Sequence, residues 1–154
     1  MILFYAIIYA SFFRNHIHPH LLSVNSGIAS FILNLFGQQT ESMGSVISSK
    51  AFSIDIKQGC DAFEPMALLA AIALAYPAAF FKKVQGVFMA IALLFSLNIV
   101  RIVSLFLTGV YFENIFDLMH IDVWQFLFML VAILLCFWFI RWTKQIPKIQ
   151  LNHA

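Results

Sequence analysis

The chain has 154 residues, of which 62% are hydrophobic and only 10% are charged, and its mean hydropathy is +0.91. Soluble globular proteins carry about 25% charged residues, so this composition excludes an ordinary soluble enzyme and indicates an integral membrane protein. A membrane-spanning helix needs about 20 apolar residues, so the length allows one bundle of roughly four to five spans and no separate soluble domain. The net charge of +2 is too small and too dispersed to indicate binding to nucleic acid.

The two N-terminal apolar segments differ from ordinary spans. Residues 1–13 lack the basic start and the small-residue cleavage site of a signal peptide, and we interpret them as a first helix whose beginning could be missing. Residues 21–36 are predicted to form an amphipathic helix lying in the membrane interface, with a fifth span as the alternative. The reason is a polar stripe at helical spacing, formed by Ser23, Gly27, Ser30 and Asn34.

Three histidines between these segments alternate around a proline, at His16, His18 and His20. Alternating histidines can bind a metal. In a loop of this composition we instead interpret them as solvated interfacial residues. We therefore predict no metal site and no other cofactor.

A polar stretch follows, and within it Phe52, Ile54 and Ile56 alternate with polar residues. Alternation of period two predicts a β-strand. Val46 and Ile47 are candidates for its partner strand, so residues 44–58 are predicted to form a small hairpin on the outer surface. Such a hairpin could cap the bundle or offer an edge to an extended peptide; a solvated connector is the alternative.

Three apolar runs are long enough to span the membrane, over residues 63–81, 84–108 and 123–140. If these spans alternate in direction, the C-terminal basic residues and Lys82 and Lys83 share one side, which the positive-inside rule predicts to be cytoplasmic. Trp124, Trp138 and Trp142 lie near the ends of the last span. They are predicted to be interfacial anchors.

The predicted fold class is therefore an all-α membrane bundle in a single integral domain over residues 1–154. It contains about four transmembrane helices, one interfacial amphipathic helix and a small extracytoplasmic β-hairpin. The predicted location is the cell membrane, where the chain would pass the bilayer several times.

Cys60 directly precedes the span over 63–81. Asp61 and Glu64 resemble a capping box, and Pro65 suits the first turn of a helix. A thiol at a helix N-terminus is drawn toward the thiolate by the helix dipole. The two neighbouring carboxylates oppose this effect, so a nearby cation is needed to stabilise the thiolate.

Arg101 is the best candidate for that cation. It lies inside the span over 84–108, where a guanidinium costs about 2.5–3.5 kcal/mol unless it is paired or reaches water. Asn98, Ser104 and Thr108 share its helical face, which predicts a polar stripe turned into the bundle. An arginine that extends to lipid headgroups is the alternative.

His120 lies at the outer start of the last span, so Cys60, Arg101 and His120 are predicted to meet at the outer ends of three different spans. A thiolate, an imidazole and a fixed cation are the groups needed for acyl transfer through a thioester. Asp117 and Asp122 could orient the imidazole. The second cysteine, Cys136, lies deep in the last span and is predicted to be a small buried hydrophobic residue.

These residues resemble the exosortase and archaeosortase family, in particular its compact members. The resemblance rests on Gly59-Cys60 before an apolar span, on Asn98-x-x-Arg101 and on His120 ahead of "IDVWQ". It implies a membrane-embedded cysteine protease or transpeptidase with Cys60 as nucleophile, Arg101 as the essential arginine and His120 as the acid or base.

The resemblance also implies the partner. It would be a membrane protein with a C-terminal sorting tail made of a short motif, a transmembrane helix and a basic cluster, cleaved on the outer face. We expect the substrate helix to pack on small residues that follow Cys60, namely Ala67, Ala70, Ala71 and Ala78. Two alternatives remain open. One is a non-enzymatic membrane assembly or small-solute transport component with a structural Arg101, and the other is a pseudoenzyme that binds tails without cutting them.

Overall fold

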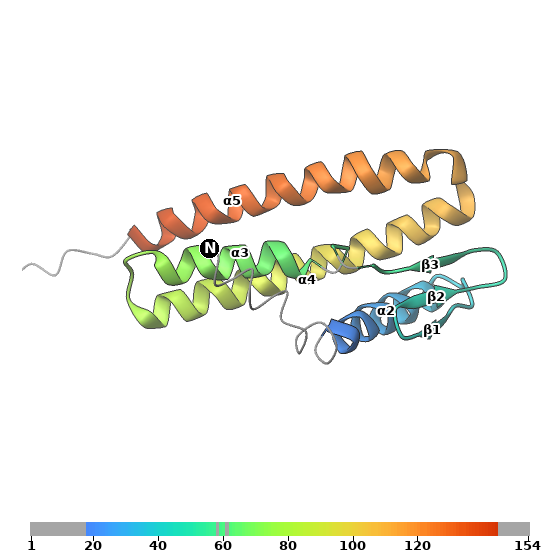
Figure 1. Cartoon of the computed structure of the whole chain (residues 1–154), viewed down its shortest axis with the longest axis horizontal. Helices are drawn as coiled ribbons and strands as arrows, with labels where there is room; N and C mark the ends of the chain where they lie inside the picture. The colour runs from blue at the N-terminus through green and yellow to red at the C-terminus, as the bar shows by residue number, and fades with distance from the viewer. Residues whose placement is uncertain (1–17, 58, 61, 145–154) are drawn as a thin grey trace, which may run out of the picture.

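The computed structural model describes residues 18–57, 59–60 and 62–144 (Figure 1). The first helix predicted over residues 1–13 lies outside the described residues, as do His16 and Asp61. In chain order the elements are α2 (His18–Leu35), β1 (Glu41–Met43), β2 (Val46–Ser48), β3 (Ser53–Asp55), α3 (Phe63–Ala75), α4 (Phe80–Tyr111), a 3-10 turn (Glu113–Ile115), a π-helical segment (Leu118–Val123) and α5 (Trp124–Lys144). The described part is mostly helical with a small antiparallel sheet, as the sequence predicted.

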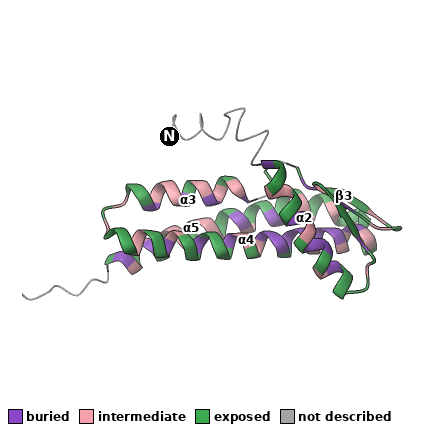
Figure 2. Ribbon diagram, turned by 90° about the horizontal axis from the view of Figure 1, so that it is seen from below, coloured by how far each residue is buried: buried purple, intermediate pink, exposed green. Residues whose placement is uncertain are grey.

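Helix α4 is the central element, because it contacts α2, α3 and α5. Its 32 residues extend about 48 Å at 1.5 Å per residue. Figure 2 shows buried residues recurring along α4, whereas much of α5 is exposed. The start of α4 lies beside the end of α5, where the Lys82 ammonium sits 5.8 Å from the centre of the Trp142 ring.

Two helical stretches among the described residues are long and apolar enough to cross a membrane, Phe80–Tyr111 and Leu118–Lys144. In the second, only 17% of the most apolar window is buried within the chain. Its apolar side chains therefore face outward, where lipid or another protein has to cover them. These two helices agree with the predicted helical membrane protein, while the count of four spans stays a prediction.

The helix expected over 63–81 is shorter than predicted. Helix α3 ends at Ala75 because Pro77 disfavours helical geometry at the residue before it. Tyr76 is accordingly extended, with ψ of 135°. At 13 residues, α3 is about 20 Å long, less than the roughly 30 Å of a bilayer core.

The predicted hairpin is present and belongs to a three-stranded antiparallel sheet in the order β1-β2-β3. Ile47 of β2 lies opposite Ile54 of β3, so the partner strand is the one that the sequence indicated. Strand β1 was not predicted, because all three of its residues are exposed and it carries no alternating pattern.

Helix α2 forms close to the predicted range, and its polar residues turn toward the sheet. The Ser26 hydroxyl donates to the Gly44 carbonyl at 2.6 Å, and Ser30 and Thr40 hydroxyls lie 2.9 Å apart. The opposite face exposes large apolar side chains such as Phe31, which is 66% exposed. One histidine prediction is wrong, because His18 at the start of α2 is buried rather than solvated.

The three tryptophans predicted to be interfacial anchors differ in their surroundings. Trp124 is only 6% exposed and packs in the core with Phe128, so it is not an interfacial anchor. Trp138 and Trp142 stack on each other with ring centres 5.5 Å apart, near the basic end of α5.

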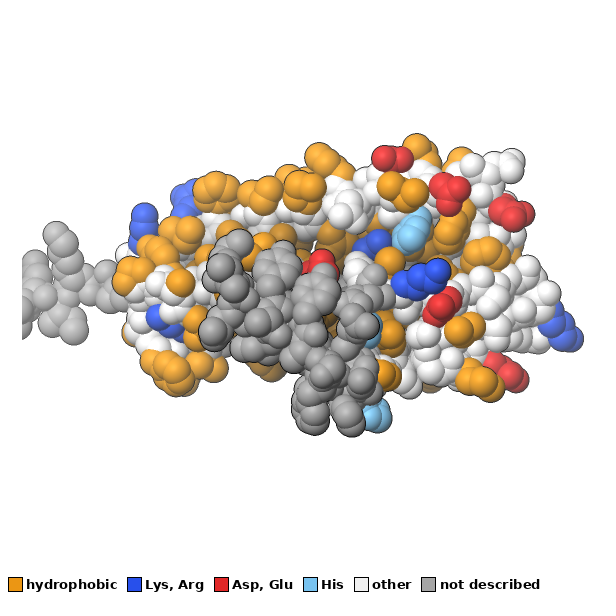
Figure 3. Space-filling model, viewed as in Figure 1, with side chains coloured by type: hydrophobic (Ala, Val, Ile, Leu, Met, Phe, Trp, Pro, Cys, Tyr) orange, Lys and Arg blue, Asp and Glu red, His pale blue; other side chains and the backbone are white. Residues whose placement is uncertain are grey.

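Charge is distributed between the two ends of the molecule. In Figure 3, acidic side chains gather toward the sheet end, and basic side chains lie both at the opposite end of the bundle and at the sheet end. The sheet end includes the exposed Lys50, between β2 and β3. The orientation across a membrane stays a prediction.

Candidate functional site

Cys60 lies in a tight turn between β3 and α3. Its amide donates to the Lys57 carbonyl at 3.0 Å, and the residue before it, Gly59, has a φ of +92° that only glycine adopts readily. Ala62 is also left-handed, with φ of 57°. The Gly-Cys pair is therefore explained by the backbone turn that presents the thiol.

The residue that caps α3 among the described residues is Ala62. Asp61 lies outside the described residues, so the capping box of Asp61 and Glu64 stays a prediction. Glu64 is exposed and lies in the first turn of the helix. Pro65 lies in the same turn, as expected for a residue without an amide donor.

Arg101 lies on α4 and is only 4% exposed. Its Nη2 donates to the Cys60 sulfur at 3.6 Å, and its guanidinium carbon lies 5.4 Å from the centre of the Phe128 ring. The Nε atom has no hydrogen-bond partner among the described residues. The alternative of an arginine extended to lipid headgroups does not hold, because the side chain is enclosed and directed at the thiol.

His120 lies on the π-helical segment Leu118–Val123. Its Nε2 atom is 3.3 Å from the Cys60 sulfur, within hydrogen-bond reach. The Phe116 ring lies against the imidazole, with ring centres 5.8 Å apart. π-Helical turns are rare and occur often at functional sites, and this one carries the imidazole into the site just before α5 begins.

The structure thus brings the three predicted residues to one sulfur atom from separate elements. Cys60 supplies a thiol, His120 can take or give its proton, and Arg101 places a positive charge and an N–H donor beside the same atom. A thiol with a base and a fixed cation in contact can act as a nucleophile toward a carbonyl carbon.

Of the residues predicted to support the site, Asn98 is buried beside Arg101, whereas the others make no contact with the three central side chains among the described hydrogen bonds. Asn98 is fully buried one turn from Arg101, and its Nδ2 donates to Asn25 Oδ1 at 3.4 Å. Ser104 donates instead to the Arg101 carbonyl of its own helix. Asp117 and Asp122 are both exposed.

Sequence reasoning missed Asn25. It is fully buried on α2, and its Nδ2 donates to the Leu21 carbonyl while its Oδ1 accepts from Asn98. Through this pair, α2 is tied to α4 next to Arg101. The signal was an asparagine within an apolar helix, but only the packing of α2 on α4 shows what it contacts.

An aromatic chain was missed as well. Phe52 follows β2 and packs against Phe106 of α4 and Phe116, each with ring centres 5.7 Å away, and Phe116 in turn contacts His120. A Cβ atom at Gly109 would clash with the Phe52 ring, so glycine allows this close approach. The sheet and the imidazole are therefore connected through edge-on and tilted ring contacts.

The Asn25–Asn98 pair leads to a prediction for stability. Asn25→Leu or Asn98→Leu alone should each lower the free energy of unfolding by about 1–3 kcal/mol, because the remaining amide loses its buried partner. The double variant should cost clearly less than the sum of the two, since neither polar group remains. Thermal unfolding in detergent measures all three, and purely additive losses would show that the two amides act independently.

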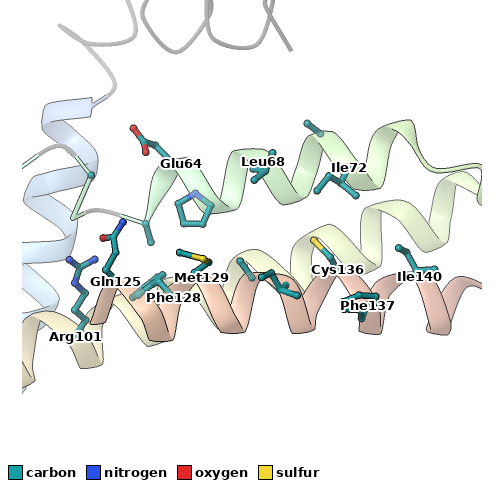
Figure 4. A pocket seen from close by; sticks show the side chains of 16 residues that line it. Glu64, Leu68, Ile72, Arg101, Gln125, Phe128, Met129, Cys136, Phe137 and Ile140 are labelled. Carbon is teal, nitrogen blue, oxygen red and sulfur yellow. The ribbon is translucent and has the colours of Figure 1, made fainter. Parts of the chain in front are cut away.

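A groove of about 710 Å³ begins at the site and runs between α3 and α5 (Figure 4). Gly59, Ala62 and Arg101 line its end at the thiol. Figure 4 shows the lining running from Gln125 at the end near Arg101 to Ile140, with Met129 and Cys136 of α5 directed toward α3, while the Glu64 carboxylate points away from α5. Cys136 packs against the core cluster as a small hydrophobic residue, but it is only half-buried because it also lines the groove.

Outward-facing apolar helices indicate a membrane protein, and its candidate site is a thiol in contact with a guanidinium and an imidazole. The chain belongs to the transmembrane exosortase family, because the family model described as transmembrane exosortase (Exosortase_EpsH) matches residues 1–138. A search of curated proteins and a search of solved structures gave no match. The family confirms the resemblance found in the sequence and supports the class of membrane transpeptidases and proteases.

Proposed function

We propose that this protein is a cysteine transpeptidase or protease that cleaves the C-terminal sorting tails of exported membrane proteins on the outer face of the cell membrane. The observation that supports the proposal best is the double contact of one sulfur, with His120 Nε2 at 3.3 Å and Arg101 Nη2 at 3.6 Å. Family membership supports the same class of reaction.

In the first step, His120 takes the thiol proton and the Cys60 sulfur attacks the carbonyl carbon of the scissile peptide bond. The carbonyl oxygen becomes an oxyanion, which the Arg101 guanidinium stabilises. The C–N bond then breaks, and the protonated imidazole gives its proton to the departing amine. The products are a thioester on Cys60 and a free membrane tail.

In the second step, water or a primary amine attacks the thioester. The imidazole accepts a proton from this nucleophile, and the sulfur leaves as thiolate and is then reprotonated. Water gives a free carboxylate, and an amine gives a new amide. The protein acts as a protease in the first case and as a transpeptidase in the second.

The proposed orientation follows from charge. The end of the bundle far from Cys60 carries four basic residues, Lys82 and Lys83 at the start of α4 and Arg141 and Lys144 in the last turn of α5. Basic residues next to a membrane span favour the cytoplasmic side. The thiol would then lie at the outer side. A tail with its basic cluster inside would present its motif at the same level as Cys60.

The test is a search for the thioester. A reporter protein is given a tail from the same genome, made of a short shared motif, one apolar helix and a basic cluster, and is co-expressed with the enzyme. We expect a reporter–enzyme adduct that survives denaturation and is released by neutral hydroxylamine, which cleaves thioesters but not amides. Mass spectrometry should place the adduct on Cys60.

The control for thiol specificity is Cys136→Ala, which should still form the hydroxylamine-sensitive adduct on Cys60, whereas Cys60→Ala should lose both adduct and cleavage. Cleavage at the normal rate in Cys60→Ala would rule out the mechanism. Adduct-free binding of the tail by the wild-type chain would identify a pseudoenzyme instead.

A further inference from the structure

We infer that the groove between α3 and α5 is the binding site for the transmembrane helix of the substrate tail, and that this helix lies along α5 with its outer end at Cys60. The inference rests on the proposed function, and it adds where the transmembrane helix of the substrate binds and how deep along α5 it lies. It also corrects the expected alanine face, since only Ala71 of the four alanines lines the groove.

Continuity with the thiol site is the first argument. Arg101, which contacts the Cys60 sulfur, lines one end of the groove, and so does Gly59, the neighbour of Cys60. A chain cleaved at Cys60 has to continue from that point. The groove is a path that leads from there along both helices toward Ile140 (Figure 4).

The distribution of polarity is the second argument. The charged and amide side chains of the lining, Glu64, Arg101 and Gln125, belong to the end at the thiol, and beyond them the lining is apolar. This matches a tail in which a polar motif precedes an apolar segment. Inside a bilayer such a segment has to be helical, because every backbone donor and acceptor needs a partner.

Length and exposure are the third argument. From Gln125 to Ile140 the lining follows α5 for about 22 Å at 1.5 Å per residue, which corresponds to about 15 residues of a parallel helix. Met129 and Phe137 are 57% and 62% exposed. Small side chains at Ala71 and Ala132 on the two walls allow a helix backbone to approach closely.

Cys136 makes the inference testable with the native chain, because its thiol lines the groove. It follows Gln125 by about 11 residues, or about 16 Å of helix. Single cysteines are placed at successive positions of the reporter's apolar segment, and disulfides are formed in membranes with the Cys60→Ser enzyme. We expect crosslinks that recur every three to four positions and are strongest about 11 residues after the cleavage site.

The matched control moves the thiol to the other face of α5. Leu134 is 56% exposed and does not line the groove, and it is about 200° around the helix from Cys136. The variant Cys136→Ala/Leu134→Cys should lose the periodic crosslinks. Equal or stronger crosslinks from Leu134→Cys would overturn the inference. It would also be overturned if a photoreactive phospholipid labelled Cys136 while a tail that the wild-type chain cleaves gave no crosslink there.

A second variant fills the groove without touching the reactive groups. Ala132→Trp should lower tail cleavage by about tenfold or more, while alkylation of Cys60 by a small thiol reagent stays within twofold of the wild type. Leu130→Trp, at an exposed position outside the groove, should leave both unchanged. Unchanged cleavage in Ala132→Trp would overturn the inference.

These outcomes are separate from failure of the proposed function. If the Cys60→Ser enzyme forms the periodic crosslinks but the wild-type chain never cleaves the tail, the groove assignment holds and the enzyme assignment fails. If the wild-type chain cleaves the tail but the Cys60→Ser enzyme gives no crosslink at Cys136, the enzyme assignment holds and the groove assignment fails.

Discussion

Replacing Arg101 by lysine is expected to lower the rate of tail cleavage by about 10²- to 10³-fold, the range found when a stabilising donor at an oxyanion is removed. Lysine keeps the charge but loses the planar fork of N–H donors. In this site one donor reaches the Cys60 sulfur at 3.6 Å while the guanidinium lies against the Phe128 ring. A single ammonium cannot keep both contacts and also reach the carbonyl oxygen. Single-turnover cleavage in membranes, at matched enzyme level, measures the loss.

Arg141→Lys is the matched control, because Arg141 is exposed in the last turn of α5, far from the thiol. It should cleave at the wild-type rate. If Arg101→Lys also kept its rate within about threefold, Arg101 would act only as a generic charge. That result would favour the non-enzymatic alternative, in which the arginine is structural.

His120→Gln is expected to reduce cleavage by about 10²- to 10⁴-fold, the usual contribution of general acid–base catalysis. Glutamine can still hydrogen-bond near the Cys60 sulfur, but it can neither take the thiol proton nor protonate the departing amine. The imidazole is well placed for both, since its Nε2 is 3.3 Å from the sulfur. The rate of reporter cleavage measures the effect, and the thioester adduct should disappear in parallel.

His20→Gln provides the comparison, because His20 is exposed on α2 and contacts none of the three site residues. We expect no change in that variant. A His120→Gln enzyme that forms the thioester as fast as the wild type would assign the proton transfer to another group, and the roles proposed above would then be wrong for the imidazole.

The long helices were predictable from the sequence because apolar runs of this length have few alternatives. The run that begins at Val84 became α4, which is a few residues longer at both ends, and the run that begins at Val123 became α5, which is longer only at its C-terminal end. The end of α3 was missed because Pro77 was read as part of a continuous apolar run. The short strand β1 has no hydrophobic pattern that a sequence could reveal.

The site was predictable where a side chain has a high free energy in its surroundings. An arginine within an apolar span needs a partner. A cysteine just before a span lies near the membrane surface, so its contact with Arg101 could be expected from the depth of both residues. Asn25 and Phe128 could not be placed in this way, because their roles depend on how α2 and α5 rotate against α4. Ser104 carried the same signal as Asn98 and yet bonds only to its own helix.

The unbroken course of α4 has a further consequence. Lys83 and Arg101 stand on one rigid rod, about 27 Å apart along its axis at 1.5 Å per residue. Inserting a single residue between them would raise the guanidinium by 1.5 Å and rotate it by about 100°. The number of residues between Lys83 and Arg101 therefore fixes the depth of the guanidinium in the membrane. The depth at which a substrate peptide bond can be cleaved is then set by the geometry of α4, independently of the sequence of the motif.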